Sequence, residues 1–211
     1  AAVRERLRGV VPELEWPSHA PYVAAINRLE AERRAVILSY NYQTPEIFHG
    51  VGDYVGDSLG LAKEAAKSKA KVIVQAGVHF MAETAKILNP TKTVVLPDMK
   101  AGCSLADGAP IERFRAWQAR YPGSVTISYI NCSAEVKAAS DIICTSSNAE
   151  KIVNSVPKDK QILFEHDRNL GRYLVKKTGR DMICWQGVCI VHETFSHKKL
   201  VALKERNPDA L

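Results

Sequence analysis

One pattern of apolar and helical segments occurs twice along the sequence. The first copy opens with the apolar run 35–41 and the second with the apolar run 125–131. Each run ends in Ser-Tyr with an Asn close behind, and helical segments of about ten residues then alternate with further short apolar runs. Short apolar runs between helices are typical of parallel strands buried on both faces. The sequence therefore predicts an α/β fold with two repeated parallel-sheet modules.

The individual elements follow from this alternation. The predicted strands are 35–41, 71–75, 93–96, 125–131, 141–144, 161–164 and 181–185. The predicted helices are 22–34, 58–68, 79–88, 110–120, 133–139, 148–155, 169–178 and 194–206. Residues 1–18 are interpreted as a lead-in that Pro12 and Pro17 interrupt, and the Gly- and Pro-containing stretch 43–57 as a loop.

The composition excludes several classes of protein. The 211 residues are 46% hydrophobic and 25% charged, and no stretch reaches the roughly 18 to 20 apolar residues of a membrane span. No charged segment followed by an apolar one opens the chain, so no secretion signal is expected. Five cysteines without the spacing of a disulfide scaffold favour a cytoplasmic location. The net charge of +6 is scattered, which favours small anionic substrates over nucleic acid.

Ligands of open α/β sheets bind beyond the carboxyl ends of the strands, and two polar turns are predicted there. One turn contains Asp57 and Ser58, and the other spans residues 145–148 and contains Ser146. Free N–H groups at a helix start can hold a phosphate or carboxylate. The alternative is plain helix capping, and the motif of a single turn favours capping over an anion site.

The ends of the two opening strands provide further candidates. Tyr129 and Asn131 are two residues apart, so they are predicted on the same side of a strand. A phenol and an amide there can bind a carboxylate or move a proton. A hydrogen-bonded pair that only ends the strand fits equally well. Tyr40 and Tyr42 occupy the corresponding place in the first copy.

Two cysteines stand in Gly-containing loops just past strand ends. Cys103 and Cys189 are 189 − 103 = 86 residues apart, and His192 follows three residues after the second. Loop thiolates can ligate zinc or iron–sulfur clusters, although no CxxC pair supports this by spacing. The three cysteines in or at the end of apolar strands are predicted to be buried and inert: Cys132, Cys144 and Cys184. His79 and His166 are predicted to be ordinary surface or loop histidines.

The chain resembles a known family, the quinolinate synthases, which are iron–sulfur enzymes of de novo NAD biosynthesis. The resemblance rests on stretches that run in family order, of which the long block Ala76 to Pro90 is highly specific. The matching stretches are 41–47, 55–59, 76–90, 101–107, 129–131, 145–149 and 187–192.

The resemblance implies a fold of three α/β modules around a pseudo-threefold axis. Residues 1–104 would form the first module with the lead-in, residues 105–190 the second, and residues 191–211 the start of a third module that is otherwise missing. Each module of the family contributes one cysteine to a [4Fe–4S] cluster, which leaves one iron open as a Lewis acid. The family reaction condenses iminoaspartate with dihydroxyacetone phosphate to quinolinate, phosphate and water.

The resemblance also implies roles for individual residues. Cys103 and Cys189 would be cluster ligands. Proton transfer would involve Tyr129, Tyr42 and His192. The substrate oxygens would be held by Tyr40, Ser58, Tyr129, Asn131 and Ser146. The implied partners are the small anionic substrates and an upstream supplier, either L-aspartate oxidase or aspartate dehydrogenase. The resemblance implies no nucleic-acid or membrane partner, and it leaves open whether the protein forms a homodimer.

The chain departs from the family pattern in three places. Tyr40 stands where the family has His, and a phenol with an ordinary pKa near 10 shuttles protons less well at neutral pH than an imidazole near 6.5. Val188 occupies a position that is often polar. The third module is absent, and with it the third cysteine and a His-Pro-Glu segment. These 211 residues alone are therefore expected to show weak or no activity, unless another cysteine or a second chain supplies a ligand.

Two other interpretations fit the sequence. One is an inactive fragment or remnant of two modules that binds small dicarboxylate or phosphate anions without a cluster. The other is a structural protein stabilised by zinc on Cys103, Cys189 and His192.

Overall fold

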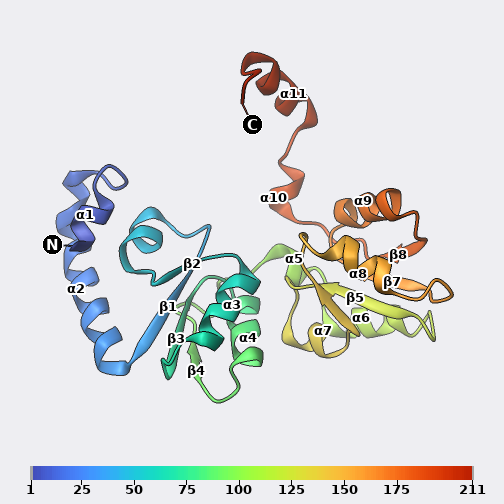
Figure 1. The fold of residues 1–211 in the computed structure, drawn as a ribbon, viewed down its shortest axis with the longest axis horizontal. Helices are drawn as coiled ribbons and strands as arrows, with labels where there is room; N and C mark the ends of the chain where they lie inside the picture. The colour runs from blue at the N-terminus through green and yellow to red at the C-terminus, as the bar shows by residue number, and fades with distance from the viewer. Residues whose placement is uncertain (1, 211) are drawn as a thin grey trace. The chain divides into compact units, whose positions relative to one another are not determined.

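The computed structural model describes residues 2–210 and shows two compact units that meet in sequence between Cys103 and Ser104. Each unit contains one four-stranded sheet in which every strand pair is parallel (Figure 1). The strand order is β2-β1-β3-β4 in the first sheet and β6-β5-β7-β8 in the second, which is the same order of strands within each unit. The prediction of two repeated parallel-sheet α/β modules is confirmed. The module boundaries proposed from the sequence remain predictions.

The first unit contains the following elements. They are α1 (Ala2–Leu7), η1 (Glu13–Glu15), α2 (Trp16–Arg33), β1 (Ala35–Tyr40), η2 (Glu46–Val51), β2 (Tyr54–Gly56), α3 (Ser58–Lys67), β3 (Val72–Ala76), α4 (His79–Leu88) and β4 (Thr93–Val95). Figure 1 shows α3 and α4 on one side of the strands and α2 on the other. The core lies under α3 and α4, where Leu38 and Ile73 of the sheet and Leu61 and Met81 of the helices are at most 1% exposed.

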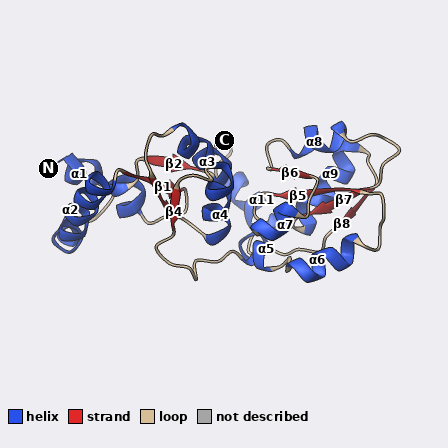
Figure 2. Cartoon of the chain, turned by 90° about the horizontal axis from the view of Figure 1, so that it is seen from below, coloured by secondary structure: helices blue, strands red, loops and turns tan. Residues whose placement is uncertain are grey.

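The second unit has the same plan with short helices on both faces. Its elements are α5 (Ser104–Asp107), α6 (Ile111–Gln118), β5 (Val125–Tyr129), α7 (Ala134–Ala138), β6 (Ile142–Cys144), α8 (Ala149–Ser155), β7 (Ile162–Glu165), α9 (Arg168–Thr178), β8 (Met182–Cys184), α10 (Ile190–Glu193) and α11 (His197–Arg206). Figure 2 shows α8 and α9 on one side of the sheet and α6 and α7 on the other. Ile127, Phe164, Val153 and Leu174 form the core beneath α8 and α9.

The repeat extends to individual hydrogen bonds. In the first unit, the backbone N–H of Ile37 donates to Oδ2 of Asp53, which directly precedes β2, at 2.7 Å. In the second, the backbone N–H of Thr126 donates to Oδ2 of Asp141, which directly precedes β6, at 2.8 Å. Each aspartate also donates its own N–H to the carbonyl of the same strand residue. In both units one carboxylate therefore joins the central strand to the start of its neighbour.

The N-terminal region differs from the prediction of an interrupted lead-in. Helix α1 lies within it, and α2 begins at Trp16 rather than Tyr22. Pro17 stands at the start of α2, where a proline needs no hydrogen-bond partner and its fixed φ suits a helix. The interpretation of Pro17 as a breaker was therefore wrong.

The loop predicted at residues 43–57 also contains regular structure. The helical turn η2 and the strand β2 both lie within it. Strand β2 is three residues long and stands at the edge of the sheet, so it is too short to show an alternating pattern. No helix within residues 2–210 combines the length and the apolar character that crossing a membrane requires.

The repeated aspartate gives a test of stability. Asp141→Ala removes the acceptor of the Thr126 N–H and should lower the free energy of unfolding of the second unit by about 1 kcal/mol. Asp141→Asn keeps a carbonyl oxygen at the same place and should lose clearly less. Urea denaturation followed by tryptophan fluorescence measures both, and equal losses in the two variants would contradict the role of this hydrogen bond.

Candidate functional site

In the first unit, two tyrosines stand where β1 ends. The ring centroids of Tyr40 and Tyr42 are 4.8 Å apart in an edge-to-face arrangement. Tyr42 is 83% exposed, so its hydroxyl is open to a ligand. The structure thus places both predicted residues together at the carboxyl end of the central strand.

The turn before α3 is a conventional helix cap. Oδ1 of Asp57 accepts from the backbone N–H of Gly60 at 2.7 Å, which confirms the capping interpretation at this turn. Ser58 is the first residue of α3 and only 7% exposed. The Ser58 side chain is therefore largely shielded from solvent.

The loop that carries Cys103 is attached to the start of α4. The backbone N–H of His79 donates to the carbonyl of Ala101 at 2.8 Å, and the loop closes on itself through Asp98, whose carboxylate accepts from the N–H of Lys100. Cys103 is a free, partly exposed thiol. His79 is exposed, as predicted.

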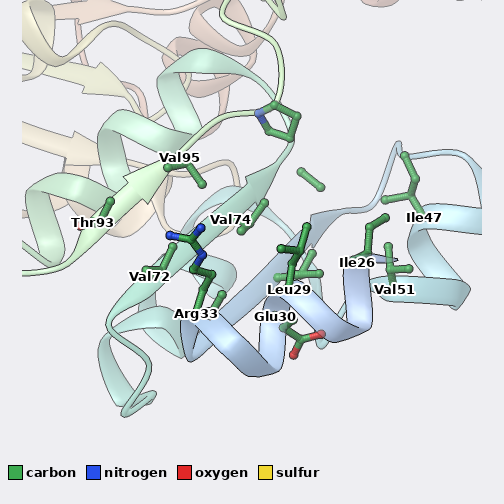
Figure 3. Close-up of a pocket in the computed structure, with 14 residues that line it drawn as sticks. Ile26, Leu29, Glu30, Arg33, Ile47, Val51, Val72, Val74, Thr93 and Val95 are labelled. Atoms are coloured by element: carbon green, nitrogen blue, oxygen red, sulfur yellow. The ribbon is translucent and has the colours of Figure 1, made fainter. Parts of the chain in front are cut away.

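The large cavity of the first unit lies elsewhere. It has a volume of about 660 Å³ and lies between α2 and the face of β1, β3 and β4 (Figure 3). Its walls are mainly aliphatic, and Glu30 lies on its rim. Burial, together with the nearby carboxylate of Asp53, raises the pKa of Glu30 to about 7. None of the predicted site residues lines this cavity, so it is separate from the candidate site.

In the second unit, Tyr129 is the last residue of β5, but Asn131 lies in the bend that follows. The prediction that the strand extends through Asn131 was wrong, and the alternation of a strand therefore does not place its side chain beside Tyr129. The ladder ends one residue after Tyr129, where the backbone N–H of Ile130 donates to the carbonyl of Cys144 at 2.9 Å.

The turn before α8 is closed by its own side chains. Oδ1 of Asn148 accepts from the backbone N–H of Thr145 at 2.7 Å, and the hydroxyls of Thr145 and Ser147 are 2.9 Å apart. Asn148 therefore braces the turn and makes no side-chain bond to the helix N–H groups. Ser146 is exposed at the tip of this turn.

His166 is the clearest departure from the sequence prediction. It is 3% exposed, and its ring centroid lies 3.8 Å from that of Tyr129. Burial is the main reason that the pKa of His166 falls to about 4; Asp167 opposes this shift, and His192 adds a smaller lowering effect. His166 is thus a neutral ring packed on Tyr129 and not a surface histidine.

Glu165 is a buried acid that the sequence interpretation missed. It is 1% exposed, it pairs in register with Ser128, and its Oε2 has no hydrogen-bond partner. Burial raises its pKa to about 8, although the Tyr129 N–H acts in the opposite direction. The carboxyl group is therefore mostly protonated at neutral pH. A Glu at the end of an apolar run was the only signal in the sequence.

Asp167, two residues after Glu165, connects the end of β7 to His192. Oδ2 of Asp167 is hydrogen-bonded to Nδ1 of His192, across 25 positions of sequence. The Asp167 side chain is 3% exposed and the His192 side chain 45% exposed. Sequence reasoning identified His192 as a candidate, but it did not identify Asp167.

Further contacts hold the Cys189 loop against the sheet. Gly187 lies so close to β7 that a Cβ there would come within 2.7 Å of the His166 carbonyl oxygen. Arg168 forms an ion pair with Glu193 of α10 at 2.7 Å. The backbone N–H of Ile190, directly after Cys189, donates to the hydroxyl of Ser104 at 3.3 Å. The loop is therefore held in place on three sides.

The five cysteines differ in accessibility. Cys132 and Cys144 are fully buried, as predicted, and burial raises the pKa of Cys144 to about 12, with Glu165 adding to the effect. Cys184 lies in the short strand β8 at the edge of the sheet and is only partly buried, so the prediction that it is buried was wrong. Each unit therefore has one loop thiol of the kind that can ligate iron, Cys103 in the first and Cys189 in the second. Residues 2–210 contain no group of three His, Cys, Asp or Glu side chains placed to hold a metal. The donors fit an iron–sulfur cluster in kind, but they form no complete ligand set.

Comparisons with known proteins give a consistent answer. A family model described as Quinolinate synthetase A protein matches residues 24–211. Quinolinate synthase of Gloeothece citriformis (strain PCC 7424) is 61% identical over 186 residues, which are 88% of this chain and 57% of that protein. Quinolinate synthase of Trichormus variabilis (strain ATCC 29413 / PCC 7937) is 61% identical over 187 residues, 89% of this chain and 57% of that protein. Quinolinate synthase of Synechococcus sp. (strain ATCC 27144 / PCC 6301 / SAUG 1402/1) is 58% identical over 199 residues, 94% of this chain and 61% of that protein.

Glu165 makes stability depend on pH. Its folded-state pKa of about 8 lies above the ordinary value of 4.5, so its protonated form stabilises the fold below pH 4.5 and this stabilisation is lost as the pH rises through 8. Glu165→Gln is neutral at every pH. Between pH 5 and pH 9, the unmodified chain should lose roughly 4 kcal/mol more of its unfolding free energy than this variant.

The exposed Glu135→Gln in the same unit is the matched control, because it makes the same chemical change outside the core. Its urea denaturation midpoints should follow those of the unmodified chain at both pH values. If Glu165→Gln and Glu135→Gln have the same pH profile, Glu165 is not a buried, protonated acid.

Proposed function

The chain belongs to the quinolinate synthase family, and we propose that it serves the condensation of iminoaspartate with dihydroxyacetone phosphate to quinolinate, phosphate and water. The chain spans about 57% of the length of the relatives from Gloeothece and Trichormus. The reaction is therefore proposed for the protein to which these two units contribute.

The observation that best supports this proposal is the hydrogen bond between Ser104 and Ile190 within the second unit. These residues directly follow Cys103 and Cys189 in the sequence. The loops after the two candidate ligands are thus tied together across 86 positions. This contact within the second unit supports the proposal that the two cysteines bind one cofactor.

In this proposal, Cys103 and Cys189 each give one thiolate to a [4Fe–4S] cluster. When bound, the cluster provides a Lewis-acidic iron that eases the loss of water from the substrate. The third thiolate comes from outside these residues or from a second chain.

The polar residues at the sheet edges would bind and orient the substrates. Ser58 and Tyr40 of the first unit and Ser146, Tyr129 and Asn131 of the second offer hydroxyl and amide groups to carboxylate and phosphate oxygens. The net charge of +6 attracts these anionic molecules. An upstream aspartate-oxidising enzyme would supply iminoaspartate. Five cysteines without the spacing of a disulfide scaffold favour a reducing, cytoplasmic setting.

Proton transfer is assigned to His192, with Tyr129 and Tyr42 as further candidates. His192 has a half-exposed ring and a buried carboxylate partner, which is the arrangement of an oriented general base. Tyr129 packs on the neutral ring of His166 and can donate from its phenol.

The proposal is tested by anaerobic reconstitution of the protein with iron and sulfide. Iron and acid-labile sulfide are measured, and quinolinate is measured after incubation with iminoaspartate and dihydroxyacetone phosphate. Cys103→Ser and Cys189→Ser should each lower bound iron at least several-fold and abolish quinolinate formation, because each removes one thiolate. The 211 residues alone are expected to turn over weakly, because two thiolates hold a cluster poorly.

Cys184→Ser is the matched control, since this partly buried thiol has no assigned ligand role. It should retain the iron content of the unmodified protein. Equal iron in all three variants would refute the ligand assignment. Binding of phosphate or dicarboxylate without any iron would instead favour a non-catalytic anion-binding remnant.

A further inference from the structure

Asp167 accepts three hydrogen bonds while almost entirely buried. Its Oδ1 accepts from the backbone N–H groups of Asn169 at 2.9 Å and Leu170 at 2.8 Å, which caps α9. Its Oδ2 is bonded to Nδ1 of His192. The residue is 2% exposed, so water cannot replace these partners.

The protonation state of Asp167 follows from these contacts. Burial alone would raise its pKa, but the Leu170 N–H and the neighbouring His166 and His192 together hold the pKa below its usual value. The group is therefore ionised at neutral pH. An ionised carboxylate can only accept hydrogen bonds, so the proton in the bond to His192 belongs to Nδ1 of the imidazole.

We propose that Asp167 is a positioning residue that holds His192 as the Nδ1–H tautomer and thereby presents Nε2 as the proton-accepting atom. The bond engages Nδ1, and 45% of the His192 side chain remains exposed. A neutral imidazole that donates through one nitrogen accepts through the other. The catalytic use of this acceptor rests on the proposed function, whereas the tautomer itself does not.

His166 provides an internal contrast on the other side of Asp167. The backbone N–H of Asp167 donates to Nδ1 of His166, so this nitrogen is unprotonated and the proton of the neutral ring is on Nε2. The ring centroids of His166 and His192 are 6.5 Å apart. One aspartate residue thus assigns opposite tautomers to two neighbouring histidines, through its backbone to one and its carboxylate to the other.

The rest of the surroundings keeps His192 in reach of Asp167. The ion pair of Arg168 with Glu193 fixes the adjacent residue of α10 to the start of α9. The Ser104 hydroxyl holds the other end of α10 through the N–H of Ile190. His192 therefore sits on a short helix that is attached at both ends, and the carboxylate contact is not left to a free loop.

The reaction gives this tautomer a use. Ring closure and the loss of water require a group that removes a proton from the substrate, and a general base works best when its free nitrogen is held in place. A buried carboxylate behind an imidazole fixes the tautomer and stabilises the charged ring that forms on proton transfer.

The test is Asp167→Asn in the 211-residue chain, observed by ¹H–¹⁵N NMR of the histidine rings. Asparagine caps helices as well as aspartate does, so α9 should remain folded. With its oxygen used by the cap, the amide presents N–H donors to His192, and Nδ1 then has to accept. His192 should change from the Nδ1–H to the Nε2–H tautomer, while His166 keeps its Nε2–H form.

The chain has six histidines, and loss of one signal in His192→Gln and in His166→Gln assigns the two rings. Two controls test whether a changed helix cap, or a weaker contact between α9 and α10, alters the His192 tautomer without any change to the Asp167 carboxylate. Asp57→Asn makes the same change in another aspartate cap, that of α3, and Glu193→Gln weakens the other contact between α9 and α10. Neither should change the His192 tautomer.

The result that overturns the proposal is an unmodified chain with His192 in the Nε2–H form, or an Asp167→Asn variant with His192 still in the Nδ1–H form. In the reconstituted enzyme, Asp167→Asn should lower kcat about 100-fold or more with little change in KM. If the unmodified enzyme makes no quinolinate, the proposed function fails, but the tautomer measurement still decides the role of Asp167.

Discussion

Parallel pairing of one central strand with a neighbour on each side is the constraint on which each unit depends. Strand β1 lies between β2 and β3, and β5 lies between β6 and β7. Parallel strands need a crossover through a helix between partners, which is why helices lie on both faces of each sheet. The same pairing directs all carboxyl ends to one edge, so Tyr40 and Tyr129 end the two central strands at equivalent places.

The carboxylates that support this plan act in different ways. Asp53 and Asp141 sit at the surface of equivalent corners and bond the central strand, so each is a part of the repeated scaffold. Asp167 sits where the first unit has Val78, the residue that precedes α4. The two units therefore have the same arrangement of strands and helices. Only the second has an acidic residue directly before the helix that follows its third strand, and this acid contacts the histidine of the Cys189 loop.

Three consecutive residues at the end of β7 show how environment decides charge. Glu165 faces the interior with one oxygen unpaired, so burial keeps it protonated to about pH 8. His166 packs on Tyr129 and stays neutral, because burial lowers its pKa to about 4. Asp167 is as buried as either, but the amides at the start of α9 help to keep it ionised. Burial disfavours charge at all three positions, and only Asp167 has enough donors to overcome it.

The sequence by itself determined the alternation of strands and helices, the repeat, the family and the burial of Cys132 and Cys144, because these depend on local apolar periodicity and on motifs read along the chain. It did not determine β2, which is too short to show a period, or the start of α2, where Pro17 permits a helix. Only the tertiary structure decided that Glu165 and His166 are buried and that Asp167 meets His192 across 25 positions. Burial and hydrogen-bond partners are set by how the crossover connections bring distant segments together, and no local pattern records that distance.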